Sequence, residues 1–212
     1  MLKTNKFTLI IMSIVTLIPM LIGVILWNHL PDEMAIHFNL HNQADGFSSK
    51  GIAVFGIPLF LLVLLWIVAF FTTRDPKKQN IGKKIHTMVL WFVPLISVIV
   101  GALLYSVNMG YAVNVPLICE LLIGFVLIII GNYLPKTRQN HSIGIRIPWT
   151  LASEDNWNRT HRLAGYLWLT MGILMVVLAM CNLFHMIWLI AILAVIIIIP
   201  LVYSYRLHTK KE

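Results

Sequence analysis

Three side chains in the N-terminal quarter have the types and spacing of a divalent-metal site. His37, His41 and Asp45 follow one another at intervals of four residues, so on a helix they would share one face. The Asn, Gln and Gly residues around them argue against a helix that reaches Asp45, and metal sites usually need three or four converging ligands. We therefore predict no metal and no other cofactor here. Residues 30–50 are interpreted as a hydrated, hydrogen-bonded loop with a turn at Asp45-Gly46.

Residue types that could support an enzyme are present but poorly arranged. The sequence contains no H-E-x-x-H, no G-x-S-x-G and no phosphate-binding glycine loop. Asp32 and Glu33 are adjacent carboxylates, whose side chains point apart on a helix or a strand. His141 and His161 each have a hydroxyl residue beside them, but sequence neighbours rarely form a nucleophile–base pair. We predict that the protein is not an enzyme.

Glu120 is an acidic residue inside a long apolar run. A carboxylate within a bilayer is costly unless it is protonated or paired, which makes Glu120 a functional candidate. The alternative is a structural role, with hydrogen bonds to Asn108 or Tyr111 near the same end of the helices. A transport pathway usually contains several such polar groups.

The elements that position these groups follow from the composition. The chain of 212 residues is 59% hydrophobic and 11% charged, with a mean hydropathy of +0.85, whereas soluble domains carry about 25% charged residues. Apolar runs of about 20 residues are long enough to cross a bilayer as helices. The predicted fold is therefore all-α: a polytopic membrane protein with six transmembrane helices, at about 7–28, 51–72, 86–107, 113–134, 163–183 and 185–205.

The basic residues predict how the six spans are oriented. Fifteen of the 16 Lys and Arg residues lie before the first span, in 73–85, in 135–162, or after the last span. Only Lys50 would lie on the other face. The positive-inside rule then places both termini and residues 135–162 in the cytoplasm, and residues 30–50 outside. Because topology accounts for the basic excess, we predict no direct nucleic-acid partner.

Residues 135–162, called the signature segment below, interrupt the apolar sequence with polar and aromatic residues. Pro135 should end a helix, and Lys136 would lie at the level of lipid phosphates. Gly144 and Pro148 favour a turning or extended backbone between residues 140 and 150. Ser153, followed by two acidic residues, is typical of a helix start.

Trp157, His161, Ala164 and Trp168 then form a helical stripe that runs into the fifth span. Packing is the favoured interpretation for Ala164 and Trp168. For Trp157, His161 and Arg162, anchoring at the membrane interface and recognition of a partner remain equally open.

The string GNYLPKTRQNHSIGIRIPWTL, followed by NWNRTHRLAG, resembles the signature of the SdpI family of bacterial membrane immunity proteins. This resemblance covers about residues 120–205. It implies that the cytoplasmic signature and partner candidates are Asn132, Pro135, Lys136, Asn140, Gly144, Arg146, Pro148, Trp149, Thr150, Trp157, Thr160, His161 and Arg162.

Residues 20–65 resemble the small domain that often precedes SdpI-type regions. Leu30-Pro31, His37-Phe38-Asn39 and Asp45-Gly46 match its pattern, whereas Ala35 and Asn42 replace a common proline and a common glycine. His41 lies outside that pattern. With Glu120 added, the candidates that would face a toxin are His37, Asn39, Asp45, Gly46, Lys50 and Glu120.

The resemblance implies a multi-pass protein of the bacterial cytoplasmic membrane that protects its bacterium from a secreted peptide toxin. It also implies signalling by holding a small transcriptional autorepressor at the membrane. The expected partners are therefore membrane lipid, the toxin and the repressor. We expect an N-terminal two-span region at 1–85 and a four-span SdpI-like region at 86–212. The alternative function is a small-solute transporter that uses Glu120.

Overall fold

The computed structural model describes residues 6–183 and 185–210. Lys3 and Lys211, two of the basic residues counted for the topology, lie outside these ranges. Within the described residues, six helices are long and apolar enough to cross a membrane, and only 17–28% of the apolar window of each is buried by the protein. The remaining apolar side chains need a lipid environment. The predicted all-α fold with six membrane spans is confirmed.

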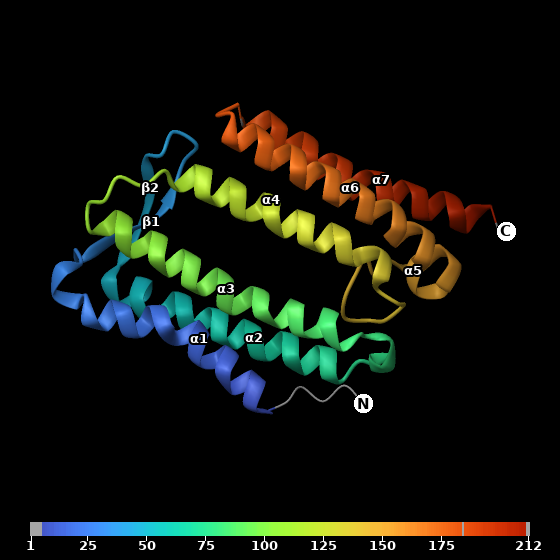
Figure 1. Ribbon diagram of the computed structural model, residues 1–212, viewed down its shortest axis with the longest axis horizontal. Coiled ribbons are helices and arrows are strands. Elements are labelled where there is room, and N and C mark those ends of the chain that lie inside the picture. Colours follow the sequence, from blue (N-terminus) through green and yellow to red (C-terminus); the bar gives the residue numbers. More distant parts are fainter. Residues whose placement is uncertain (1–5, 184, 211–212) are drawn as a thin grey trace. The chain divides into compact units, whose positions relative to one another are not determined.

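The first of two compact units contains Met1–Arg74 and His86–Pro116. Its helices are α1 (Lys6–Ile25), α2 (Ile57–Thr73) and α3 (Lys83–Asn108), with a π-helical turn at Ile52–Gly56 before α2 (Figure 1). The three helices meet in an apolar core made of Leu9, Met12, Leu65, Ala69, Leu90 and Val93.

Residues 30–50 form a β-hairpin, which the sequence interpretation as a loop did not foresee. Strand β1 (Glu33–Phe38) pairs antiparallel with β2 (Ala44–Ser49). The predicted turn at Asp45-Gly46 is wrong, because both residues lie in β2 and the chain reverses at residues 39–43. Asn42 takes the positive φ of 59° that this reversal needs, a conformation that Asn adopts more readily than most residues.

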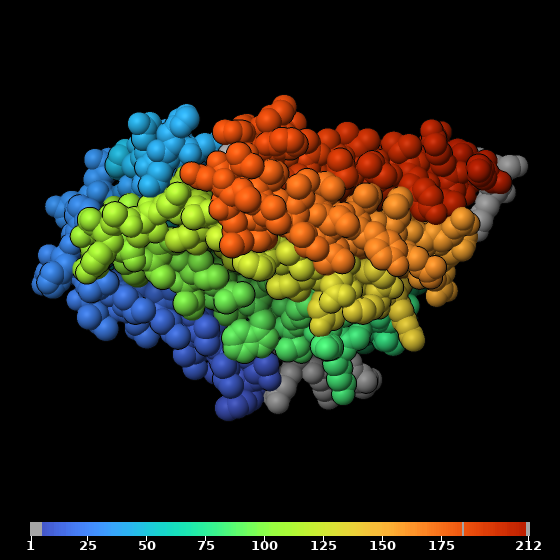
Figure 2. All heavy atoms as spheres, turned by 45° about the horizontal axis from the view of Figure 1, so that its top comes forward, coloured from blue at the N-terminus to red at the C-terminus, as the bar shows by residue number. Residues whose placement is uncertain are grey.

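The second unit contains Asp75–Ile85 and Leu117–Glu212. Its long helices are α4 (Val115–Tyr133), α6 (Glu154–Met180) and α7 (Met186–Thr209), with a short helix α5 (Pro148–Ala152). Helices α6 and α7 lie side by side, in orange and red in Figures 1 and 2. Helix α6 begins nine residues before the predicted fifth span, because the end of the signature segment is helical and continuous with it.

Four glycines bring α4 and α6 close together. A Cβ atom on Gly131 or Gly165 would collide with the backbone of the facing helix, and the pair Gly124 and Gly172 is equally close. Small residues at such contacts are a common basis of helix association in membranes, where there is little hydrophobic driving force between helices. The contact holds the end of α4, where the signature segment begins, against α6.

In the structure, α3 packs in the same compact unit as α1 and α2. The division predicted from the sequence, into regions 1–85 and 86–212, concerns sequence resemblance and not compactness, and it stays a prediction. Asp75–Ile85 is notable because α2 and α3 from His86 onward belong to the first unit, whereas this segment, which includes the first three residues of α3, packs in the second.

Candidate functional site

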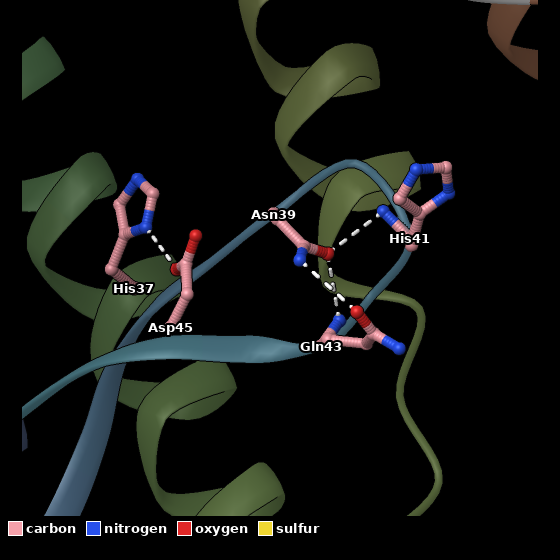
Figure 3. A network of polar contacts seen from close by, with 5 residues as sticks. All are labelled: His37, Asn39, His41, Gln43 and Asp45. Carbon is pink, nitrogen blue, oxygen red and sulfur yellow. Dashed lines mark hydrogen bonds and ion pairs between the residues drawn. The ribbon is translucent and has the colours of Figure 1, made fainter.

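The hairpin presents a polar pair on its exposed face. His37 Nδ1 lies 2.5 Å from Asp45 Oδ1, and the two side chains are 72% and 43% exposed (Figure 3). Gly46 lies opposite His37 in the strand register, and a Cβ atom at Gly46 would lie 2.8 Å from His37 Cβ. Gly46 therefore gives the histidine room to reach the carboxylate. Ile36 and Phe47 are also exposed, so the hairpin surface mixes polar and apolar groups.

Asn39 organises the reversal of the hairpin. Its side-chain oxygen accepts hydrogen bonds from the backbone N–H groups of His41 and Gln43, at 2.9 and 3.1 Å (Figure 3). The helix that would have aligned His37, His41 and Asp45 does not form. Among residues 6–183 and 185–210, no three His, Cys, Asp or Glu side chains come together in a way that could hold a metal ion.

Asn42, which the sequence analysis did not single out as a site residue, connects the hairpin tip to the segment after α3. Its amide donates to the carbonyl of Val113 at 2.9 Å and its oxygen accepts from the N–H of Val115 at 3.0 Å. Asn108 holds strand β1 in the same way: its side-chain oxygen accepts from the N–H of Ala35 at 2.8 Å, and its amide donates to the carbonyl of Ala35 at 2.9 Å. The local sequence carries no signal for either long-range contact.

The Lys50 side chain is held by contacts within the protein. Its ammonium lies 3.0 Å from the carboxylate of Asp32, 3.2 Å from the carbonyl of Trp27 and 5.2 Å from the centre of the Trp27 ring. The side chain is only 12% exposed. Lys50 thus fixes the end of the second strand to the connection between α1 and β1, through Trp27 and Asp32.

Glu120 lies partly exposed on α4, within a candidate membrane span. Its carboxylate has no hydrogen bond or ion pair to the part of the chain that the structure describes. Asn108, one of the two partners suggested from sequence, is instead bonded to Ala35 and to the carbonyl of Leu104. The functional role of Glu120 stays a prediction.

The first half of the signature segment is irregular, as predicted, and is organised by Asn140. This fully buried side chain accepts from the N–H groups of Ser142 and Ile143, at 2.9 and 2.7 Å, and donates to the carbonyls of Arg138 and Ile143, at 2.8 and 3.0 Å. All the hydrogen-bonding capacity of the amide group is therefore used to shape the backbone.

Thr150 closes the next turn. It is fully buried, accepts from the N–H of Ile147 at 3.1 Å and lies 2.7 Å from the carbonyl oxygen of Ile145. The helix α5 that starts at Pro148 was not expected; proline suits its first turn because the N–H of that position has no helical partner. Trp149 of this helix packs edge-on against Tyr205 of α7, with ring centres 5.1 Å apart.

Trp157, His161 and Gly144 form the centre of the segment. The Trp157 and His161 rings are stacked with centres 3.9 Å apart, and both are buried. The N–H of Ile145 donates to His161 Nε2 at 2.9 Å, so the ring is neutral and its Nδ1–H donates to the carbonyl of Trp157 at 2.9 Å. The Trp157 indole donates to the carbonyl of Thr137 at 2.7 Å.

Gly144 is required by this stack for two reasons. Its φ of 120° is one that side-chain-bearing residues rarely adopt, and a Cβ atom there would collide with His161 Nε2 and the Trp157 ring. Packing therefore explains Trp157 and His161. Ala164 is fully buried and Trp168 donates to the carbonyl of Ile196 at 3.1 Å, so their packing interpretation is confirmed.

Helix α6 begins as predicted at Ser153, whose hydroxyl accepts from the N–H of Asn156 at 3.3 Å. Asn156 and Thr160 then build a buried polar contact with α7. The Asn156 side chain donates to the carbonyl of Ser204 at 2.9 Å, and its oxygen accepts from the hydroxyls of Ser204 and Thr160, at 2.6 and 3.0 Å.

The charged candidates of the signature segment remain at the surface. Arg146 and Arg162 are exposed; Arg146 donates one hydrogen bond to the carbonyl of His141 at 2.9 Å. Lys136 is exposed and lies 3.1 Å from Asn132 Oδ1 and 5.1 Å from the centre of the Tyr133 ring. Pro135 follows α4 in a short 3₁₀ turn and contacts Gly165. The exposed cations are the groups that a partner or a lipid phosphate could reach.

Comparison with known proteins agrees with the predicted resemblance. The SdpI/YfhL protein family matches residues 136–204, and a domain of unknown function, DUF1648, matches residues 14–62. The chain is 29% identical over 199 residues to the protein named Immunity protein SdpI of Bacillus subtilis (strain 168), covering 92% of this chain and 91% of that protein. No solved structure matches the chain. The resemblance to the SdpI family is therefore confirmed, and with the six apolar helices it identifies a multi-pass protein of the bacterial cytoplasmic membrane.

Proposed function

We propose that this membrane protein, which matches the SdpI/YfhL family over residues 136–204 and DUF1648 over residues 14–62, protects its bacterium from a secreted peptide toxin. The observation that carries the proposal is the similarity to a protein named as an immunity protein, which extends over nearly the whole of both chains. A non-enzymatic role is part of the proposal.

The toxin would be met by the hairpin, which the distribution of basic residues places outside the membrane. The hairpin is held to its unit by Asn42, Asn108 and Lys50. Its exposed side chains include the His37–Asp45 pair and the apolar Ile36 and Phe47. A surface of mixed polarity that is already held in place suits a peptide that arrives from water, because less ordering of the hairpin is then needed on binding.

The test is survival of a toxin-sensitive bacterium that expresses the chain and is exposed to the peptides secreted by the strain of origin. The full chain should protect, and His37→Ala or Asp45→Ala should reduce protection at unchanged membrane abundance. His41→Ala is the matched control, because His41 lies in the same reversal but donates to Asn39 through its backbone N–H, which alanine keeps. Absence of any protection by the full chain against all these peptides would refute the proposed function.

Repressor capture on the inner face is the second part of the proposal. Arg146 and Arg162 are exposed and present planar groups that can make paired hydrogen bonds to carboxylates, which Lys cannot copy. We expect Arg146→Ala and Arg162→Ala to reduce toxin-dependent membrane recruitment of a fluorescent repressor while some protection is kept. Arg159→Ala is the control, since Arg159 already lies 3.9 Å from Asp155 on the same helix. Normal recruitment by both variants would leave the signature segment with a structural role alone.

The alternative, a small-solute transporter, is favoured by one observation: Glu120 lies in a span without a partner among the described residues. Solute-dependent flux in liposomes containing the purified chain would support transport. Toxin-specific survival without such flux would support immunity.

A further inference from the structure

The segment Asp75–Ile85, called the strap below, joins two helices of the first unit yet packs in the second. It follows the end of α2 at Arg74, and its last three residues, Lys83–Ile85, are already the first turn of α3. Both of its ends are therefore covalently fixed to membrane helices. A short segment of this kind cannot stay unchanged if the ends of those two helices move apart.

Asp75 attaches the strap to the signature segment. The side chain is only 4% exposed, although it lies in a connection between spans. One carboxylate oxygen accepts from the N–H of His141 at 2.8 Å and from the hydroxyl of Ser142 at 2.5 Å, and the other accepts from the N–H of Lys77 at 2.7 Å. A carboxylate is suited to this position because it accepts without needing to donate.

A second set of contacts fastens the rest of the strap. The Lys77 ammonium contacts the side-chain oxygen of Gln139, and the Asn80 amide donates to the Gln139 carbonyl at 2.8 Å. The Ile81 side chain is 3% exposed. The residues held in this way, 139–142, directly precede Gly144 and the backbone that packs on His161.

The two ends of the strap are set by a buried hydrogen bond between α2 and α3. Thr72 and His86 are 2% and 3% exposed, and His86 Nε2 lies 2.9 Å from the Thr72 hydroxyl oxygen. That hydroxyl also lies 2.7 Å from the carbonyl oxygen of Val68 and 3.2 Å from that of Ala69, both on its own helix. The contact with His86 fixes the spacing of the helix ends beside the strap.

We propose that the strap is a mechanical coupling element, in which the Thr72–His86 contact sets its ends and Asp75 transmits their position to residues 139–146 of the signature segment. Such a coupling would let an event on the toxin-facing unit alter the repressor-facing segment, and this biological role rests on the proposed function. The coupling itself is a property of the isolated chain and can be measured without toxin or repressor.

The test is amide hydrogen exchange of residues 139–146 in the purified full chain in detergent. Asp75→Ala should raise exchange roughly tenfold or more, because three hydrogen bonds to a buried acceptor are lost. Thr72→Val keeps the shape but removes the bond to His86, and should raise exchange roughly two- to tenfold. In the Asp75→Ala background, Thr72→Val should add nothing, since the strap is already detached.

Thr73→Val is the matched control, because within the described residues the Thr73 hydroxyl bonds only to the carbonyls of Ala69 and Phe70 on its own helix. It should leave residues 139–146 unchanged. His86→Leu removes the same bond from the other side and must reproduce the result of Thr72→Val, which covers the case in which one variant does not fold. The proposal is overturned if Asp75→Ala leaves exchange unchanged, or if Thr72→Val has no effect or the same effect in both backgrounds. A failed survival assay would refute the immunity function but would not affect the conclusion about coupling, which depends on hydrogen exchange alone.

Discussion

Replacement of Gly144 by alanine tests the interpretation of the signature segment most directly. The φ of 120° is poorly tolerated by side-chain-bearing residues, and the added Cβ would collide with His161 Nε2. The backbone strain costs about 1–3 kcal/mol. Loss of the Ile145–His161 hydrogen bond adds about 0.5–1.5 kcal/mol, and disturbance of the stacked rings adds a further ~0.5–1.5 kcal/mol.

The sum, about 2–6 kcal/mol, should appear as easier local opening of the segment, because these contacts all lie within it. We expect the amides of residues 139–147 in Gly144→Ala to exchange at least roughly tenfold faster than in the wild type, since about 1.4 kcal/mol corresponds to a factor of ten. Amides of the β-hairpin should be unaffected.

Gly82→Ala is the matched control, because a Cβ atom at Gly82 would have nothing within 4 Å and its backbone lies outside the left-handed region. Exchange in that variant should match the wild type throughout. Wild-type exchange in Gly144→Ala would refute the view that the Trp157–His161 stack and the glycine beside it fix the backbone of this segment.

Three further predictions concern other parts of the chain. Reporter fusions after Lys78 and Gln139 should give cytoplasmic signals and one after Gln43 an extracellular signal; the reverse at Gln139 would invert the topology. Glu120→Gln keeps the shape but cannot ionise, so protection should fall if the charge matters, whereas full protection by both Glu120→Gln and Glu120→Leu would exclude the residue from the mechanism. Asn42→Ala loses two hydrogen bonds to the segment after α3 and should destabilise the hairpin by about 1–3 kcal/mol, measured by local hydrogen exchange, with Asn42→Asp retaining the bond from Val115.

The resemblance to the SdpI family could be recognised from the sequence, whereas the roles of the signature residues could not. Asn140, Thr150 and Thr160 were candidates for partner recognition, and their side chains are instead buried and bonded within the protein. A residue that belongs to a family motif can serve partner recognition or folding. A side chain that is buried and hydrogen-bonded within the protein serves folding, whereas an exposed one is free to contact a partner. Arg146 and Arg162 keep their place as recognition candidates because they are exposed.

The sequence by itself determined the six spans and the start of α6 at Ser153. Both depend on short-range physics: a bilayer needs about 20 apolar residues per helix, and a helix start needs a local acceptor for its free N–H groups. The tertiary structure alone decided the hairpin reversal at Asn42, the attachment of Asp75 to Ser142, and the fit of Gly144 against His161. The reason is that two of these rest on partners more than 60 residues away, and the third on two elements that meet only after folding.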